Sequence, residues 1–425
     1  MDYKAVVLDG VKYLEENLRA DVTAQDLADR AGFSLYHYYR LFQEQTHMPV
    51  MQYVIRRRIL HALNSVENGA SQADAALTYG FSTYAGFYKA CKREFGYTPR
   101  ELKERLAGRI PAPWKGETLM LTQKQIRPYL ISYHLENEPV SAVFDSGGGQ
   151  EPNLWAIGKE YLLRAEKDFA RLQAECAVQQ AMADRGLLAS TPVKTGDGKE
   201  ILREDELSVC LFRRAEGEWL RAQEVYSDDT ALQLGVALGK LNGALHSVDY
   251  AADEADLFRA AMVWALPKSK EILGLQTEWC KKFLDECARL SPALPRQLIH
   301  RDPCPGNVMR AKDAWGFHHF NLMEKNVRLF DPCYAATAVL SETYADSAGN
   351  DWFRLCRHIL RGYDQAAGLT PEEKQAAPYV VLSIQMICVA WFSEQEQFKD
   401  VFQVNVDATR FLIDHFHSLR LAGQD

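Results

Sequence analysis

Two nearly identical four-residue segments are the feature that most constrains this chain. AGFS occupies positions 31–34 and YGFS positions 79–82, about 48 residues apart. Each follows a short run of helical apolar spacing and precedes a longer one, and there is almost no strand signal in residues 1–107. A glycine-containing turn between two helices, present twice, indicates a helical fold with two similar halves.

The first half has clear helix boundaries. Val6 to Leu18 carries apolar residues at helical spacing, and Thr23 opens a Thr-x-x-Asp box that is typical of a helix start. We expect that helix over Ala24–Ala31 and its end at Gly32. Ser34 then caps the next helix, so the order helix, turn, capped helix predicts a helix-turn-helix.

The second half repeats this order. Ser71 starts a helix that ends at Tyr79-Gly80, and Phe81-Ser82 opens a further one. A long helix from Val50 to about Val66 joins the halves and bears Arg56–Arg58, which either bind phosphates or form a solvated face. Two such units on a rigid helix present two recognition helices about one DNA turn apart.

Residues ~5–107 resemble the AraC-type DNA-binding domain from end to end. The positions that carry the resemblance are Ala28, Gly32, Phe33, Ser34, Arg40, Leu41 and Phe42 in the first half and Ala76, Gly80, Phe81, Phe87, Lys89, Lys92, Phe95, Gly96, Thr98 and Pro99 in the second. The ending FGYTPRELKERL is the family's usual close. The resemblance implies a transcription regulator that binds specific double-stranded DNA through residues 1–107.

The resemblance also implies which residues read DNA. They are Ser34, Tyr36, Tyr39 and Arg40 in the first recognition helix and Thr83, Tyr84, Tyr88 and Lys89 in the second. We expect Arg40 to bind guanine by two parallel hydrogen bonds, and the tyrosines to contact phosphates or thymine methyls. The alternative for Tyr36 and Tyr39 is a place in the core, which is where we expect Tyr38.

The charge of the chain is unevenly distributed. The 425 residues suggest two or three domains and carry a net charge of −8. Residues 1–110 hold 15 Lys and Arg against 13 Asp and Glu, whereas the remainder holds 34 against 44. A slightly basic head on an acidic body is compatible with DNA binding by the head alone.

Cysteine spacing, the first residues and the apolar stretches bear on location. None of the nine cysteines lies in a CxxC pair, so we expect small core residues in a reducing cytoplasm. The start MDYKAVVLDG lacks the pattern of a signal peptide. The longest apolar stretch, Tyr379–Phe392, is interrupted by Ser383 and Gln385, which favours a buried helix over a membrane span. We expect a cytoplasmic protein with no membrane partner.

A change of pattern follows residue 107. Residues 108–118 include the Pro- and Gly-rich GRIPAPWKG and predict a short linker. The runs ISYHL, SAVFDSG, NLWAIG and EYLLRA then predict strands, followed by a helix over Phe169–Arg185 and a strand over Leu207–Arg213. From Thr230 the chain is mostly helical, with an interruption near 296–331. We therefore expect an all-α double helix-turn-helix domain followed by a two-lobed α+β domain.

The segment LIHRDPCPGNVM at 298–309 carries the strongest chemical signal. Asp302 after His300, with Asn307 five residues later, provides a carboxylate for an acceptor hydroxyl and an amide for a metal, as phosphoryl transfer requires. This resembles the aminoglycoside phosphotransferase and choline kinase family, which is related to protein kinases. The resemblance implies a kinase-like fold over residues 119–425, with Asp302 as catalytic base or as a remnant that holds a ligand or the loop.

Other positions of the family can be traced in the same way. Gly148 and Gly149 of SGGGQEPN lie in a possible phosphate loop. The resemblance places Arg164 at the usual phosphate-pairing lysine, Glu175 as its ion-pair partner, and Asp331 at a structural aspartate. His300 is expected to brace the loop.

One position departs from the family. His319 stands where the family has the aspartate that holds the metal, and a neutral imidazole is a poor ligand for Mg²⁺. We therefore expect a sensor of a small molecule with little or no catalysis, which binds Mg·ATP only if the nucleotide site is retained. The alternatives are a working phosphotransferase fused to the regulator, or a domain that only mediates assembly.

The sequence indicates only the chemical class of the ligand. Family substrates are small hydroxyl compounds that are often cationic, and the acidic body of the chain favours a cation. A zinc site at His318 and His319 is not expected, because neighbours on a strand point to opposite faces. The sequence specifies neither the ligand nor an oligomeric state.

Overall fold

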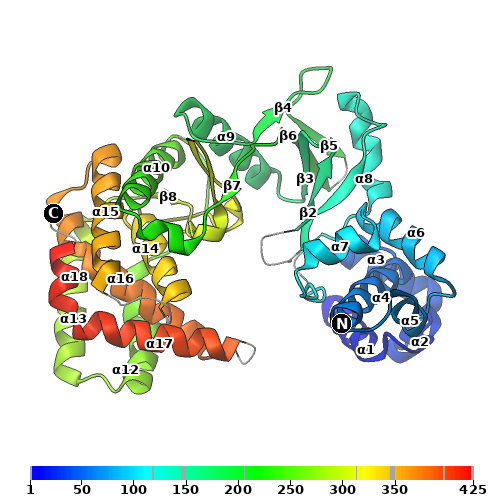
Figure 1. Cartoon of the computed structure of the whole chain (residues 1–425), viewed down its shortest axis with the longest axis horizontal. Coiled ribbons are helices and arrows are strands. Elements are labelled where there is room, and N and C mark those ends of the chain that lie inside the picture. Colours follow the sequence, from blue (N-terminus) through cyan, green and yellow to red (C-terminus); the bar gives the residue numbers. More distant parts are fainter. Residues whose placement is uncertain are drawn as a thin grey trace. The chain divides into compact units, whose positions relative to one another are not determined.

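The chain folds into two compact units in the computed structural model (Figure 1), which describes residues 2–116, 119–144, 150–204, 206–312, 314–344, 350–395 and 398–422. Unit 1 comprises Met1–Leu172 with Pro192–Arg214, and unit 2 comprises Gln173–Thr191 with Ala215–Asp425. Unit 1 begins with helices and continues into an antiparallel sheet, whereas unit 2 is mainly helical. These elements confirm the expected fold class.

Capping residues set the helices of the first part of unit 1. The helices are α1 (Tyr3–Asn17), α2 (Ala24–Ala31), α3 (Leu35–Thr46), α4 (Val50–Glu67), α5 (Gln72–Thr78), α6 (Tyr84–Phe95) and α7 (Pro99–Leu106). Thr23 and Asp26 form the reciprocal capping box of α2, and Gly32 ends that helix in the left-handed conformation at φ 70°. Ser34 and Ser71 cap α3 and α5 as predicted.

The arginines of α4, expected either to bind phosphates or to form a solvated face, mostly contact other parts of the protein. Arg57 is buried and donates to both carboxylate oxygens of Glu15, at 2.6 and 2.7 Å. Arg56 is also buried, with its guanidinium 4.6 Å from the ring centre of Phe95. Arg58 donates to two backbone carbonyls beyond the end of α1. For Arg56 and Arg57 both expected roles are wrong, because these two side chains are buried, whereas the role of the half-buried Arg58 stays a prediction.

The sheet of unit 1 has the strand order β1-β2-β3-β6-β4, with β5 paired to β6. Its strands are β1 (Val140–Phe144), β2 (Gln150–Ile157), β3 (Tyr161–Glu166), β4 (Thr191–Val193), β5 (Ile201–Glu204) and β6 (Leu207–Arg213). β6 has the bounds that the sequence predicts. α9 (Phe169–Asp184) follows β3 and continues into unit 2.

The predicted first strand of this region is wrong. The first three residues of ISYHL form the 3-10 helix η1 (Ile131–Tyr133), which continues α8 (Gln123–Leu130). A capping box between Thr122 and Gln125 starts α8, so helical geometry is already established before ISYHL begins. The alternation of apolar residues there is too short to decide between strand and helix.

The later helices of the head share a hydrophobic core with the sheet, whereas α1–α3 and the start of α4 form a separate core. The shared core joins residues of α4, α6 and α7, such as Leu63, Phe95 and Leu102, to strand residues such as Trp155 and Leu211. The expected linker packs as well, since Trp114 is buried and its backbone N–H donates to the hydroxyl of Tyr53. The ranges 1–107, 108–118 and 119–425 follow motifs rather than packing, and they stay a prediction.

Unit 2 is built around long helices. Its helices are α10 (Asp228–His246), α11 (Leu257–Ala260), α12 (Leu266–Leu273), α13 (Thr277–Leu290), α14 (Phe330–Thr343), α15 (Asn350–Ala367), α16 (Pro371–Phe392), α17 (Lys399–Asp414) and α18 (Phe416–Ala422), with the π-helical segment η3 (Ala261–Ala265) between α11 and α12. Glycines let α10 and α15 approach closely: a Cβ on Gly362 would lie 2.0 Å from the carbonyl oxygen of Leu232.

Two small sheets of unit 2 hold the loops that carry the phosphotransferase-like motif. β7 (Glu218–Trp219), β9 (Val308–Ala311) and β10 (Ala314–Phe317) form one, and β8 (Arg296–Ile299) and β11 (Glu324–Val327) form the other. The predicted interruption of the helical pattern near 296–331 is confirmed by these strands. They bring the loop after β8 next to the loop after β10.

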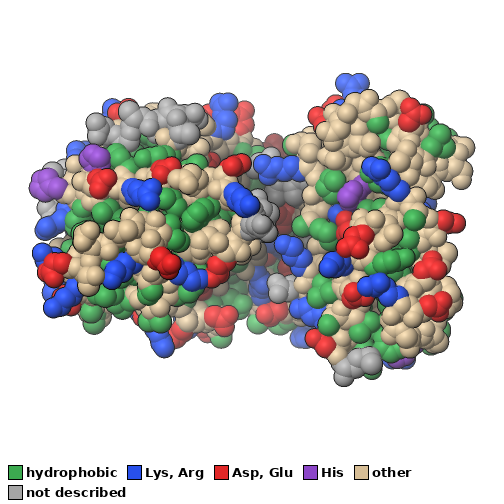
Figure 2. Space-filling model, turned by 90° about the horizontal axis from the view of Figure 1, so that it is seen from below, with side chains coloured by type: hydrophobic (Ala, Val, Ile, Leu, Met, Phe, Trp, Pro, Cys, Tyr) green, Lys and Arg blue, Asp and Glu red, His purple; other side chains and the backbone are tan. Residues whose placement is uncertain are grey.

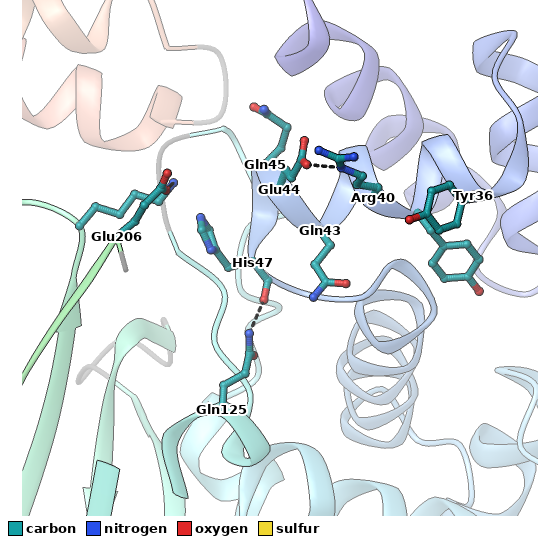
Figure 3. Close-up of a pocket in the computed structure, with 10 residues that line it drawn as sticks. Tyr36, Arg40, Gln43, Glu44, Gln45, His47, Gln125 and Glu206 are labelled. Atoms are coloured by element: carbon teal, nitrogen blue, oxygen red, sulfur yellow. Dashed lines mark hydrogen bonds and ion pairs between the residues drawn. The ribbon is translucent and has the colours of Figure 1, made fainter. Parts of the chain in front are cut away.

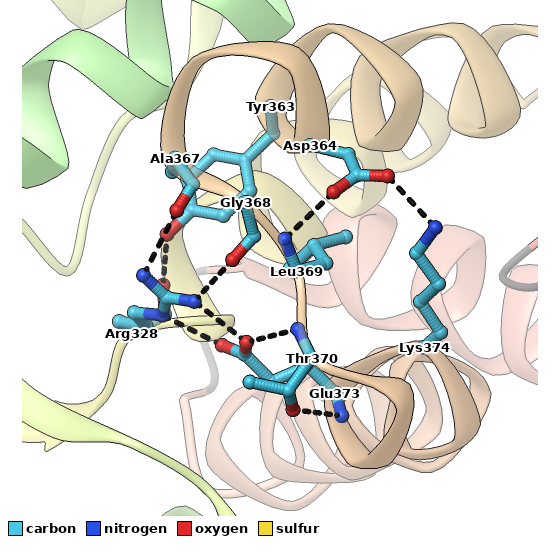
Figure 4. Close-up of polar contacts among 9 residues, drawn as sticks. All are labelled: Arg328, Tyr363, Asp364, Ala367, Gly368, Leu369, Thr370, Glu373 and Lys374. Carbon is cyan, nitrogen blue, oxygen red and sulfur yellow. Dashed lines mark hydrogen bonds and ion pairs between the residues drawn. The ribbon is translucent and has the colours of Figure 1, made fainter.

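A buried ion pair ties β11 to the start of α16 (Figure 4). Arg328 donates to both carboxylate oxygens of Glu373, at 2.8 and 2.7 Å, and also to the carbonyl of Gly368. Glu373 is fully buried and also completes the capping box of α16 with Thr370. One carboxylate thus fixes both a helix start and a strand end.

The apolar stretch at Tyr379–Phe392 forms the second half of α16. Among the described residues, α16 is the one helix long and apolar enough to cross a membrane, and 67% of its apolar window is buried inside the protein. This burial favours a core helix, as expected. None of the nine cysteines, all of which the structure describes, forms a disulfide, and seven of them are buried.

Candidate functional site

The first candidate site is the exposed face of α3. Ser34 accepts a hydrogen bond from the backbone N–H of His37 and so positions the start of the helix. Tyr36 is 79% exposed, Tyr39 is half-buried, and the exposed Arg40 pairs with Glu44 at 2.6 Å. Tyr38, in contrast, lies in the core as expected. The three predicted reading side chains therefore lie at or near the surface.

The second recognition helix, α6, presents a similar face. Thr83, one residue later than the expected start, caps the helix by accepting a hydrogen bond from the N–H of Gly86 at 3.0 Å. Tyr84, Tyr88 and Lys89 are exposed, and the hydroxyl of Tyr84 donates to Gln72 at 2.6 Å. The accessibility of these side chains is what DNA reading requires, and their individual roles stay predictions.

The second candidate site is the loop after β8 in unit 2. The side-chain amide of Asn307 donates to the backbone carbonyl of Asp302 at 2.8 Å and to its carboxylate at 2.9 Å. Both residues are half-buried. The amide thereby fixes the direction of the carboxylate, and the structure brings these two predicted residues together.

His300 braces this loop from below, as expected. Its Nδ1 accepts a hydrogen bond from the backbone N–H of Asp302 at 3.2 Å, and its Nε2 lies 2.8 Å from the carbonyl oxygen of His318. The proton therefore sits on Nε2 and is donated to that carbonyl. Burial lowers the pKa of His300 to about 4, so the ring is neutral at pH 7.

Asp331 holds the backbone of the same loop. Its carboxylate accepts hydrogen bonds from the N–H groups of His300 and Arg301, each at 2.9 Å. Burial raises its pKa to about 7, although the two hydrogen bonds act in the opposite direction. Arg301 has φ 74°, so these bonds also hold the loop in a left-handed conformation.

His319 lies just beyond β10 in the left-handed conformation at φ 66°. It follows the end of the strand, so the strand geometry assumed for the two histidines does not apply. Magnesium prefers hard oxygen ligands and a neutral imidazole is a poor one, so His319 does not fit the metal-holding role that the family resemblance gives to this position. Among the described residues no group of three or more His, Cys, Asp or Glu is arranged to hold a metal.

The remaining nucleotide-site predictions are not tested. Gly148 and Gly149 lie outside the described residues. Arg164 is buried in unit 1 and lies 4.0 Å from Glu166, whereas Glu175 belongs to unit 2. Their expected ion pair thus stays a prediction.

The sequence did not reveal the residues that surround Asp302. Tyr334 and Glu342 of α14 and Cys388 of α16 interact electrostatically with its carboxylate. Partial desolvation, with a smaller contribution from Asp302, raises the pKa of Glu342, although this residue is exposed at the surface. These residues come from distant parts of the chain, so no local spacing indicated them.

Similarity to known proteins identifies the N-terminal part. Residues 27–105 match the model of the helix-turn-helix domain. The chain is 35% identical over 102 residues to the probable transcription factor PqrA of Proteus vulgaris, covering 23% of this chain and 84% of PqrA. This chain belongs to the AraC-type helix-turn-helix family.

Two further relatives of this AraC-type regulator also match about a quarter of its length. It is 29% identical over 96 residues to the HTH-type transcriptional activator AarP of Providencia stuartii, covering 22% of this chain and 71% of AarP. It is 25% identical over 109 residues to the regulatory protein SoxS of Escherichia coli (strain K12), covering 25% of this chain and all of SoxS. These relatives correspond to the head alone.

The C-terminal part is a kinase-like domain. Residues 144–320 match the model of the phosphotransferase enzyme family. Amicoumacin kinase hAmiN, solved with AMP-PNP, Ca²⁺ and Ami, is 14% identical with a TM-score of 0.49, covering 74% of this chain and 96% of that one. A microcompartment-associated aminopropanol kinase is 15% identical with a TM-score of 0.49, covering 71% and 99%.

Proposed function

We propose that this AraC-type regulator binds specific double-stranded DNA through α3 and α6, and that its kinase-like domain senses a small molecule without transferring phosphate. The observation that carries the second part is His319. The family resemblance assigns His319 to the metal position, while His300, Asn307 and Asp331 form the hydrogen bonds that hold the loop. A preserved frame without the metal carboxylate suits binding better than catalysis.

The proposal for DNA reading rests on the two exposed helix faces. Ser34, Tyr36, Tyr39 and Arg40 of the first unit and Thr83, Tyr84, Tyr88 and Lys89 of the second are the proposed contacts. Arg40 supplies the guanine contact, since its guanidinium is exposed and only an exposed glutamate holds it. We further propose that the protein acts in the cytoplasm, where DNA is available to it.

The ligand is proposed to be a small cation with hydroxyl groups. Among the described residues, neither Asp302 nor Glu342 forms an ion pair, and the charge of Asp302 contributes to the raised pKa of Glu342. A cation between them would stabilise both charged forms. This gives Asp302 the role of ligand holder rather than of catalytic base.

The test is a transfer assay with the full-length protein, γ-labelled ATP, Mg²⁺ and a panel of aminoglycosides and choline-like amines. We expect no transfer above background from the wild type. Transfer by the wild type at rates near one per second or faster, typical of kinases, would overturn the sensor proposal in favour of a working phosphotransferase. His319→Asp restores the carboxylate, and transfer by that variant alone would mark a decayed enzyme.

Binding is measured on the same panel by melting temperature, with and without millimolar Mg·ATP. A ligand that binds only the native state raises the melting temperature, and about 100-fold excess over Kd corresponds to roughly 2.7 kcal/mol. We expect a rise with at least one cationic compound and its loss in Glu342→Gln. No shift with any compound would favour a domain that serves assembly alone.

A further inference from the structure

A polar groove runs along the exposed face of α3 (Figure 3). Its lining includes Tyr36, Tyr39 and Arg40 of α3, together with Lys167 and Glu206. Lys167 lies between β3 and α9, and Glu206 lies between β5 and β6. All five residues belong to unit 1, and the groove encloses about 900 Å³. Two charged residues next to strands of the kinase-like sheet thus line the same groove as the predicted DNA-reading side chains.

Titration of His47 supports this arrangement. His47 follows the last residue of α3 and lines the same groove, and its backbone carbonyl accepts a hydrogen bond from Gln125 at 2.9 Å. Burial lowers its pKa first, Lys167 lowers it further, and Glu206 acts in the opposite direction. The charges of Lys167 and Glu206 therefore influence the pKa of a residue at the end of the recognition helix.

Both exposed cations of the groove are held by carboxylates. Arg40 pairs with Glu44 at 2.6 Å, and the Lys167 ammonium lies 3.7 Å from Glu206. Exposed pairs of this kind contribute little to stability, because water and salt screen them. Each cation is therefore free to exchange its carboxylate for a phosphate at little cost.

We infer that Lys167 contacts the phosphate backbone of the duplex that α3 reads. This rests on the proposed DNA binding. A duplex whose major groove receives Tyr36 and Arg40 presents a phosphate strand on either side of the helix, and one strand enters the groove. Lysine binds phosphate as a point charge, so it adds affinity without sequence preference. In the free protein, the carboxylate of Glu206 pairs with the Lys167 ammonium in place of that phosphate.

Two substitutions give opposite outcomes. Lys167→Ala removes the contact, and we expect binding to weaken about 3- to 10-fold at moderate salt, equally for a selected duplex and a random one. The slope of log affinity against log salt falls by about one. Glu206→Gln removes the competing charge, and we expect tighter binding.

The matched control is the pair of Lys199 and Asp197. It lies in the same unit, with side chains 63% and 59% exposed against 46% and 79% for Lys167 and Glu206, and neither residue lines the groove. Lys199→Ala and Asp197→Asn should leave both affinity and salt slope unchanged. All four substitutions are at exposed positions, and equal melting temperatures will confirm that the fold is intact.

The experiment uses the full-length protein and a fluorescent duplex that the protein itself selects from a random library, titrated over a range of NaCl concentrations with Arg40→Ala in parallel. If Arg40→Ala weakens binding while Lys167→Ala behaves like Lys199→Ala, the Lys167 contact is wrong and DNA reading by α3 stands. If the wild type binds no duplex, both fail. A uniform loss and a reduced slope in Lys167→Ala alone would establish the contact.

Discussion

Glu15 is the residue on which the central arginine of α4 depends. Arg57 is fully enclosed, and Glu15 supplies both oxygens of its bidentate pair, with His61 at 3.2 Å as a further neighbour. Burial raises the pKa of Glu15, but hydrogen bonds from His61 and Arg57 outweigh it and the pKa lies below its ordinary 4.5. The carboxylate is therefore charged in the folded head.

Glu15→Gln should destabilise the head by about 2–3 kcal/mol at pH 7, because it leaves the buried Arg57 without its counter-charge. The folded-state pKa of Glu15 is depressed, so its contribution is fully present above about pH 4.5 and is lost as the pH falls through the folded value. Urea unfolding of both proteins between pH 7 and pH 3 measures this. A difference that does not shrink in acid would contradict the charge assignment.

Arg40→Ala should weaken specific DNA binding by about 1–3 kcal/mol, because it removes the proposed contact to guanine. Arg100→Ala is the matched control, since Arg100 also pairs with a glutamate one turn later and is 87% exposed, but lies on α7. Fluorescence titration with selected and random duplexes separates the two. If Arg40→Ala loses no discrimination between the duplexes, the assignment of α3 as the reader is wrong.

At the scale of elements, close packing of α10 against α15 organises unit 2. Gly235 and Gly362 bring the two backbones together, since a Cβ at Gly235 would lie 2.1 Å from the carbonyl oxygen of Ile359. The contacted atom belongs to the backbone and not to a side chain that could rotate away. The helices themselves would therefore have to separate. Small residues at these two positions set the distance between the helices.

Gly362→Ala should therefore cost about 1–3 kcal/mol or more, even though alanine favours helix formation. Gly243→Ala on α10 is the control, because its nearest neighbour is the side chain of Arg185 at 3.3 Å, which has room to move. We expect that control to be neutral or slightly stabilising. Thermal unfolding of the two variants tests the account, and equal stabilities would refute it.

The helices of the head were predictable because their signals are local. The tertiary contacts between these helices were not predictable from the sequence. Thr23 and Ser34 set helix starts through bonds to residues three positions later, which a sequence displays directly. The partner of Arg57 lies 42 residues away, so its burial left no local trace. The prediction of a strand at ISYHL is wrong because this short alternation fits both a strand and a helix, and the capping box before it favours the helix.

For the whole molecule, the kinase-like sheet and the DNA-binding helices form one unit. On the face shown in Figure 2, basic and acidic side chains are interspersed rather than gathered by sign. The proposed DNA recognition therefore relies on individual cations, Arg40 and Lys167, rather than on a basic patch of this face. The motif positions Asp302 and Asn307 were predictable from spacing, whereas Glu342 and Lys167 were not, because only folding brings them to their sites.

The most direct test of the account is in vitro selection of duplexes from a random library by the full-length protein. Two recognition helices on one rigid head predict a bipartite motif whose halves lie about one helical turn, roughly 10 base pairs, apart. The half read by α3 should contain a guanine whose preference is lost in Arg40→Ala. Selection of no motif, or of one indifferent to both recognition helices, would contradict the claim that this protein is a DNA-reading regulator.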